Sequence, residues 1–114
     1  MGKYFLEDEK VRVNFDDGEW VDIKEELTQA DQDYILNQMT FAEQGNNGTK
    51  MEIKLGQLSL LERSIVDWSF LETNGNKIPI NSDNISRLRK RYRNKILQEI
   101  NNLNEKAESF ASKN

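Results

Sequence analysis

The most one-sided group of charged side chains is a basic run in the C-terminal part of the chain. Six basic residues and no acidic residue lie between Arg87 and Lys95. Such a run could neutralise the phosphates of a nucleic acid, dock on an acidic protein surface or form a solvated helix face. The whole chain has a net charge of −4 and an isoelectric point near 4.9, which opposes nonspecific nucleic-acid binding. The acidic character of the whole chain therefore favours the other two roles of the run over nucleic-acid binding.

The remaining reactive side chains form no catalytic or metal-binding pattern. The carboxylates of Asp16, Asp17 and Glu19 cluster in one predicted turn, without the alternating acids and distant glutamate of a calcium loop. Histidine and cysteine are both absent, which removes the commonest general base and the commonest metal ligands. Gly45 and Gly48 lack the Gly-Lys-Ser/Thr ending of a phosphate-binding loop. We expect no enzymatic activity, no metal and no cofactor.

Length and composition indicate one domain, residues 1–114, with a modest core, because 36% of the 114 residues are apolar and 32% are charged. No run of about 18 apolar residues could span a membrane, and the N-terminus lacks the apolar centre of a signal peptide. We therefore expect a cytoplasmic protein without a membrane partner. Residues 1–34 contain eleven Asp/Glu and four Lys/Arg, so the chain is acidic at the end opposite the basic run. This polarity can steer partners or order self-association.

The N-terminal part is predicted to be a β-hairpin over residues 10–23. Val11, Val13 and Phe15 alternate with polar residues and would share one face of a strand. The Asp-Gly pair at 17–18 suits the turn, and Trp20 begins the return strand as an expected core anchor.

A helix is predicted over residues 28–41, because Thr28 can cap it and Asp31 places negative charge in its first turn. Two glycines and two asparagines follow within a polar stretch, which predicts a mobile loop over 42–50.

The next apolar segment fits a helix over residues 56–70. Leu58, Leu61, Ile65 and Trp68 follow helical spacing, and Ser59 with Glu62 matches a capping box. Trp68 is expected to be a packing residue. A turn at Asn74-Gly75 and a short extended segment around Pro79 then lead towards the last helix.

The last helix is predicted to be long, covering residues 82–108, with Asn81, Ser82 or Asp83 as its cap. At 1.5 Å per residue it would be roughly 40 Å long, which exceeds what the small remaining domain needs to cover. Part of it is therefore left for a second copy of the chain or for a partner protein. Its apolar side chains form one stripe: Ile85, Leu88, Tyr92, Ile96, Ile100 and Leu103.

Together these elements predict an α+β fold that is mainly helical, with an N-terminal β-hairpin followed by about three helices. The candidate contact residues are all on the last helix and combine its basic and apolar side chains. They are Arg89, Arg91, Tyr92, Arg93, Ile96 and Leu97.

Two segments carry an ordered arrangement of turn and core residues. The first, residues 15–28, contains a strand end, the turn Asp17-Gly18-Glu19-Trp20 and a charged step into a helix. The second, residues 66–85, contains the Asn74-Gly75 turn and Ile78-Pro79-Ile80 before a capped helix start. In this order they resemble the small tail assembly chaperones of long-tailed (siphovirus-type) phages and prophages.

The resemblance implies a non-enzymatic protein that binds the tape measure protein, the tail tube protein or both during tail morphogenesis. Such a protein would act in the host cytoplasm and be absent from the mature virion. Two alternatives stay open. One is a small nucleic-acid-binding or regulatory protein that uses the basic helix 87–95, and the other is a structural tail or connector component.

Overall fold

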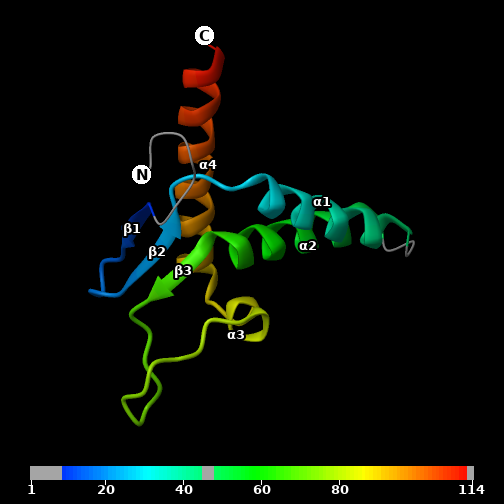
Figure 1. Cartoon of the computed structure of the whole chain (residues 1–114). Coiled ribbons are helices and arrows are strands. Elements are labelled where there is room, and N and C mark those ends of the chain that lie inside the picture. The colour runs from blue at the N-terminus through cyan, green and yellow to red at the C-terminus, as the bar shows by residue number, and fades with distance from the viewer. Residues whose placement is uncertain (1–8, 45–47, 113–114) are drawn as a thin grey trace.

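The chain has an α+β fold in which helices predominate, as the sequence predicts. The computed structural model describes residues 9–44 and 48–112, with the side-chain environments of residues 9–38 and 56–105. Figure 1 shows a small sheet, a pair of helices that project from one side of it, and a long C-terminal helix. In chain order the elements are β1 (Lys10–Asn14), β2 (Trp20–Lys24), α1 (Gln29–Gln44), α2 (Gly48–Ser64), β3 (Ile65–Trp68), α3 (Ser82–Ser86) and α4 (Lys90–Ser112).

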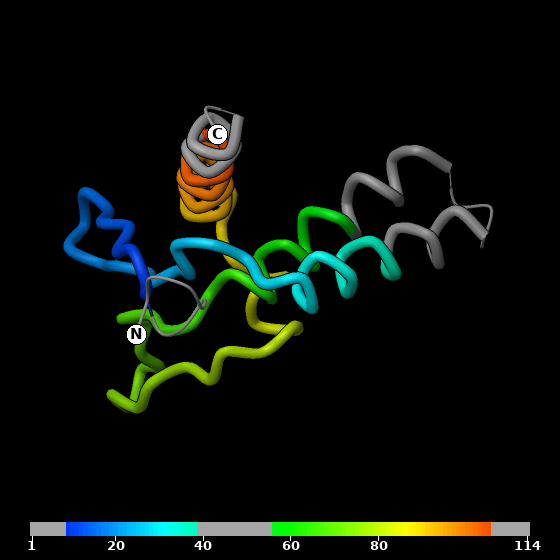
Figure 2. The backbone as a smooth tube through the Cα atoms, turned by 45° about the horizontal axis from the view of Figure 1, so that its top comes forward, coloured from blue at the N-terminus to red at the C-terminus, as the bar shows by residue number. Residues whose placement is uncertain are grey.

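The helices lie in two directions relative to the sheet. α1 and α2 contact each other and form an arm that projects to one side, as both views show (Figures 1 and 2). α4 runs across this direction, contacts β1 and α2, and its C-terminal end extends past the sheet (Figure 1). Within the described part of the chain, no helix combines the length and apolar character needed to cross a membrane.

The predicted hairpin over 10–23 is confirmed, because β1 pairs with β2 antiparallel, with Val13 opposite Val21. Its turn is closed by two backbone hydrogen bonds. Phe15 donates its N–H to the Glu19 carbonyl at 2.9 Å, and Gly18 donates to the Phe15 carbonyl at 3.1 Å. Gly18 has a φ of +88°, a conformation that glycine adopts without the steric cost borne by other residues.

The predicted helix over 56–70 is wrong at both ends, because α2 begins at Gly48 and β3 replaces its last part. β3 pairs antiparallel with β2, with Val21 opposite Trp68 and Ile23 opposite Ile65. Val66 is the extra residue of a β-bulge, so Ile65 and Trp68 point to the same face although they are three residues apart. That spacing imitates a helix, while the β-branched and aromatic side chains of this segment favour a strand.

The capping box predicted at Ser59 and Glu62 is also wrong. Ser59 is buried within α2, well after the start of the helix. The Glu62 carboxylate instead accepts hydrogen bonds from the Tyr34 hydroxyl and the Ser82 hydroxyl, both at 2.8 Å. Glu62 therefore links α2 to α1 and to α3.

Asp31 joins the arm to the sheet. Its side chain is 3% exposed and forms ion pairs with Lys24 of β2 at 2.9 Å and Arg63 of α2 at 3.0 Å. It also accepts the backbone N–H of Thr28 at 3.0 Å, while the Thr28 hydroxyl accepts the Asp31 N–H at 3.2 Å. This reciprocal capping box confirms Thr28 as the helix cap.

The helix that Thr28 caps continues to Gln44 rather than ending at residue 41. The loop predicted over 42–50 is correspondingly too long, because residues 42–44 belong to α1 and residues 48–50 to α2. Residues 45–47 lie outside the described part, so the mobility predicted for this loop is untested.

The long helix predicted over 82–108 is interrupted. α3 ends at Ser86 and α4 begins at Lys90, so that residues 87–89 form a junction. Asn81 is the cap of α3, because its side chain accepts the Asn84 N–H at 2.8 Å. An uninterrupted helix would bring Arg87 close to the basic side chains three and four positions later, and repulsion between like charges at these spacings disfavours it.

The core lies where the inner face of the sheet meets α2, α3 and α4. Trp68 is 1% exposed, which confirms it as a packing residue. Trp20 is not the expected core anchor, because it lies half-buried on the outer face with the Arg12 guanidinium 3.7 Å from its ring centre. The buried apolar residues are Val13, Val21, Ile23, Leu61, Ile65, Trp68, Ile85, Ile96 and Ile100.

Candidate partner-binding groove

Residues 69–78 form a second hairpin-like loop, which extends from the end of β3 (Figure 1). Its turn repeats the geometry of the first. Glu72 donates its N–H to the Asn76 carbonyl at 2.7 Å, and Gly75 donates to the Glu72 carbonyl at 2.9 Å with a φ of +87°. The turn predicted at Asn74-Gly75 is therefore confirmed, and the molecule has two turns of similar geometry.

A groove of about 450 Å³ lies between this loop, the first turn and the α3–α4 junction. Its walls combine aromatic, aliphatic and charged side chains from segments far apart in the sequence. The lining residues are Asp17, Glu19, Trp68, Phe70, Leu71, Ile78, Asn84, Arg87, Leu88, Arg89 and Tyr92.

Three aromatic rings form one side of the groove. The Phe70 ring centre lies 5.4 Å from that of Trp68 and 5.2 Å from that of Tyr92, and the second pair is edge-to-face. The indole N–H of Trp68 donates to the Ile78 carbonyl at 2.7 Å, which fixes the base of the loop. These contacts preorganise an apolar surface that needs little ordering when a partner binds.

Asp17 holds the first turn against α4. It accepts a hydrogen bond from the Tyr92 hydroxyl and one from Arg91 Nη2 at 3.0 Å. The Tyr92 hydrogen bond and the nearby Arg91 charge lower the pKa of Asp17 below its usual value, and the same bond raises the pKa of Tyr92. The contact is therefore complete at neutral pH, with Asp17 ionised and Tyr92 protonated.

The basic run does not form a single solvated face, because two of its members turn towards the hairpin. Arg91 pairs with Asp17, and Lys95 donates through Nζ to the Asn14 carbonyl. The run therefore divides into residues that stabilise the fold and residues at the α3–α4 junction.

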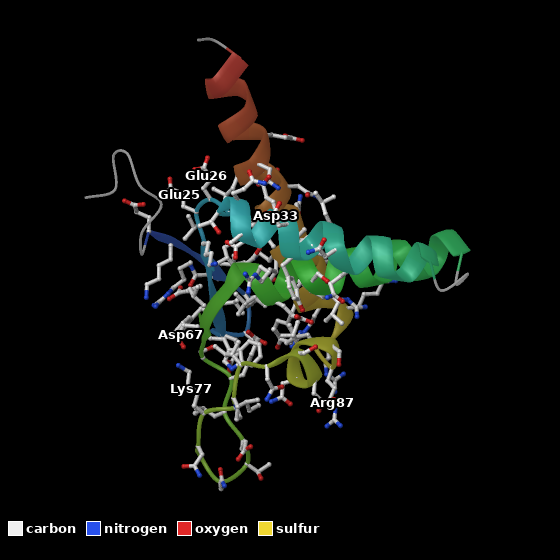
Figure 3. All side chains as sticks on the ribbon, turned by 45° about the vertical axis from the view of Figure 1, so that its right-hand side comes forward. Glu25, Glu26, Asp33, Asp67, Lys77 and Arg87 are labelled. Atoms are coloured by element: carbon white, nitrogen blue, oxygen red, sulfur yellow. The ribbon has the colours of Figure 1, made fainter. Side chains whose placement is uncertain are left out.

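The junction residues Arg87 and Arg89 are exposed and line the groove. Arg87 has one ion pair, with Asp83 at 3.5 Å, in which both side chains are more than 70% exposed. Within the described residues, Arg89 has no ion pair. Figure 3 shows Arg87 beside α3, well away from Glu25 and Glu26 at the start of the arm.

The six predicted contact residues do not lie together. Arg89 and Tyr92 line the groove, and Arg91 lies beside the first turn. Arg93 is half-buried outside the groove. Ile96 is 0% exposed and therefore a core residue, which contradicts its expected role in direct contact. Leu97, the other apolar contact candidate, is half-buried against the core.

The sequence reasoning missed the contribution of the 69–78 loop. Leu71 is the largest omission, because its side chain is 60% exposed and lines the groove. The signal that could have found it is its position three residues before Asn74 of the Asn-Gly turn, where a hairpin side chain leaves the core. Across the loop, Lys77 pairs with Asp67 of β3 (Figure 3) and lowers the pKa of that carboxyl.

The chain matches no protein-family model, no curated protein and no solved structure. Among the described residues, no three acidic side chains come close enough to share a metal ion. The chemistry that the groove itself offers is thus an apolar wall with two arginines at one end.

Proposed function

We propose that this chain is a non-enzymatic tail assembly chaperone of a long-tailed phage or prophage. It binds the tape measure protein, the tail tube protein or both in the host cytoplasm, and it leaves before the virion matures. The observation that carries the proposal is the origin of the groove. Seven of its eleven lining residues come from segments 15–28 and 66–85, which carry the resemblance to this family.

The physical character of the groove supports reversible protein binding. Leu71 is 60% exposed and lines the same groove as Phe70, while charged residues surround this apolar surface. An apolar centre with a polar rim is typical of surfaces that bind a segment of another protein. Such a surface can cover an apolar patch of a tail protein until polymerisation displaces the chaperone.

Two substitutions of similar kind test the use of the groove. Leu71 and Val66 are both exposed apolar residues, at 60% and 42%, but only Leu71 lines the groove. The chain is co-expressed with candidate tape measure and tail tube proteins from its gene neighbourhood, and it is then affinity-purified. We expect either tail protein to co-purify with the wild type and with Val66→Asp, and to be lost with Leu71→Asp.

Three results would contradict the proposal. The first is a gene neighbourhood without tail genes, and the second is a failure of both tail proteins to co-purify with the wild type. The third is the presence of the chain in purified virions, which would favour a structural tail or connector component instead.

A further inference from the structure

We propose that the groove recognises a protein segment in which apolar side chains stand beside carboxylates. Arg87 and Arg89 would bind the carboxylates, and Leu71 would contact the apolar side chains. This inference rests on the proposed function, because it specifies the partner chemistry of the same groove.

The first argument is the balance of charges that are left for a partner. The acidic lining residues are already engaged, because Asp17 is paired with Arg91 and Glu19 accepts a hydrogen bond from the Ser69 hydroxyl at 2.5 Å. Arg87 has only its exposed pair with Asp83. Among the described lining residues, Arg87 and Arg89 at the α3–α4 junction are therefore the charged groups most available to a partner.

The second argument is that the interruption between α3 and α4 brings these two arginines to one groove. Residues two apart on a continuous helix point about 200° from each other, at 3.6 residues per turn. At the junction, Arg87 donates its N–H to the Asn84 carbonyl at 3.2 Å, which tightens the end of α3. The Arg89 carbonyl accepts the Tyr92 and Arg93 N–H groups, both at 3.1 Å, and so starts α4. Both side chains consequently line the same groove.

The third argument concerns the class of the partner. Arginine binds carboxylates through paired hydrogen bonds that lysine cannot reproduce. A nucleic acid would present many phosphates and gain affinity from many cations. This groove has two arginines, whereas Arg91 and Lys95 of the basic run are bound to the hairpin. An acidic, apolar protein segment fits these features better.

The test uses two fluorescein-labelled peptides of about 12 residues that share the same leucines and alanines. The polar positions are glutamate in one peptide and lysine in the other, and binding to the full chain is followed by anisotropy at low salt. We expect the glutamate peptide to bind the wild type about tenfold more tightly than the lysine peptide. We expect Arg87→Glu/Arg89→Glu to reverse this preference.

Neighbouring single substitutions provide the control. Arg89→Glu and Lys90→Glu change the net charge equally and lie side by side, but only Arg89 lines the groove. We expect Arg89→Glu to weaken binding of the glutamate peptide severalfold and Lys90→Glu to leave it nearly unchanged. Circular dichroism melting of each variant verifies that the fold is retained.

Several outcomes would overturn the inference. They are equal binding of the two peptides, equal effects of the two single substitutions, no binding of either peptide at millimolar concentration, and tighter binding of a DNA duplex than of the glutamate peptide. Results against the proposed tail role can be told apart from results against this charge recognition. Tail proteins that still co-purify with Arg87→Glu/Arg89→Glu would refute only the charge recognition, whereas a peptide preference without any tail-protein binding would refute only the tail role.

Discussion

Removing the side chain of Asp31, near the start of α1, should destabilise the protein strongly. The carboxylate is 3% exposed and simultaneously pairs with Lys24, pairs with Arg63 and accepts the Thr28 N–H. Breaking a buried ion pair by deleting one partner costs about 3–5 kcal/mol. The two basic side chains are 32% and 38% exposed and stay partly hydrated, which places Asp31→Ala at the lower end, about 3 kcal/mol.

Asp31→Asn separates the contribution of the carboxylate charge to stability from that of the helix cap. An asparagine oxygen can still accept the Thr28 N–H, while both ion pairs are lost, so we expect a smaller cost of about 2 kcal/mol. Urea unfolding followed by tryptophan fluorescence measures both values, because Trp68 moves from the core to water.

The pH dependence provides a second check on Asp31. Burial acts to raise the pKa of Asp31, but the hydrogen bonds from Lys24 and Thr28 outweigh it and lower the pKa. A lowered pKa in the folded state stabilises the protein above the unfolded value of about 3.9, and this stabilisation is lost as the pH falls through the folded pKa. The difference between wild type and Asp31→Ala should therefore shrink below about pH 4.

Asp33 supplies the matched control, because it lies on the same helix, is exposed and bonds only to the Gln29 amide in the described part of the chain. Asp33→Ala should change the free energy of unfolding by less than about 0.5 kcal/mol. The reasoning would be refuted if Asp31→Ala cost no more than Asp33→Ala at pH 7.

Two further substitutions test the aromatic wall of the groove. Trp68→Ala should cost about 3–5 kcal/mol in urea unfolding, because it empties a fully buried site and removes the hydrogen bond to Ile78, and an unchanged midpoint would show that the core is assigned wrongly. Tyr92→Phe should raise the pKa of Asp17 towards its usual value, because the Tyr92 hydroxyl is the main cause of its lowering. Carboxyl NMR titration measures the pKa of Asp17, and an unchanged value would contradict the contact. Arg91→Ala removes a lesser cause of the lowering and should raise the pKa of Asp17 less.

The sequence predicts the elements whose signals are local. The hairpin over 10–23 follows from the alternation of Val11 and Val13 and from the Asp-Gly turn, and the structure has both. Thr28 and Asp31 likewise identify a helix start that the capping box confirms. Each signal involves residues a few positions apart, so no distant contact is needed to interpret it.

The sequence does not predict features that depend on distant partners. Ile65 and Trp68 are three residues apart, which fits one face of a helix. Only the pairing with β2 reveals a bulge that puts both side chains on one face of a strand. The stripe of the last helix continues through Leu88 without a proline or glycine, so the junction leaves only a weak local signal, the like-charge spacing of Arg87 with Lys90 and Arg91. The attachment of Arg91 to Asp17 joins residues 74 positions apart, so the sequence alone does not show that part of the basic run is bound to the hairpin.

The bulge at Val66 also affects how the protein behaves at high concentration. β3 is an outer strand of the described sheet, and an outer strand with a regular backbone invites pairing with another chain. A bulge interrupts that regular backbone. Deleting Val66 would put Ile65 and Trp68 two positions apart, where a regular strand still directs both side chains inward. We therefore expect the deletion variant to fold but to aggregate at concentrations at which the wild type stays soluble, a difference that light scattering would detect.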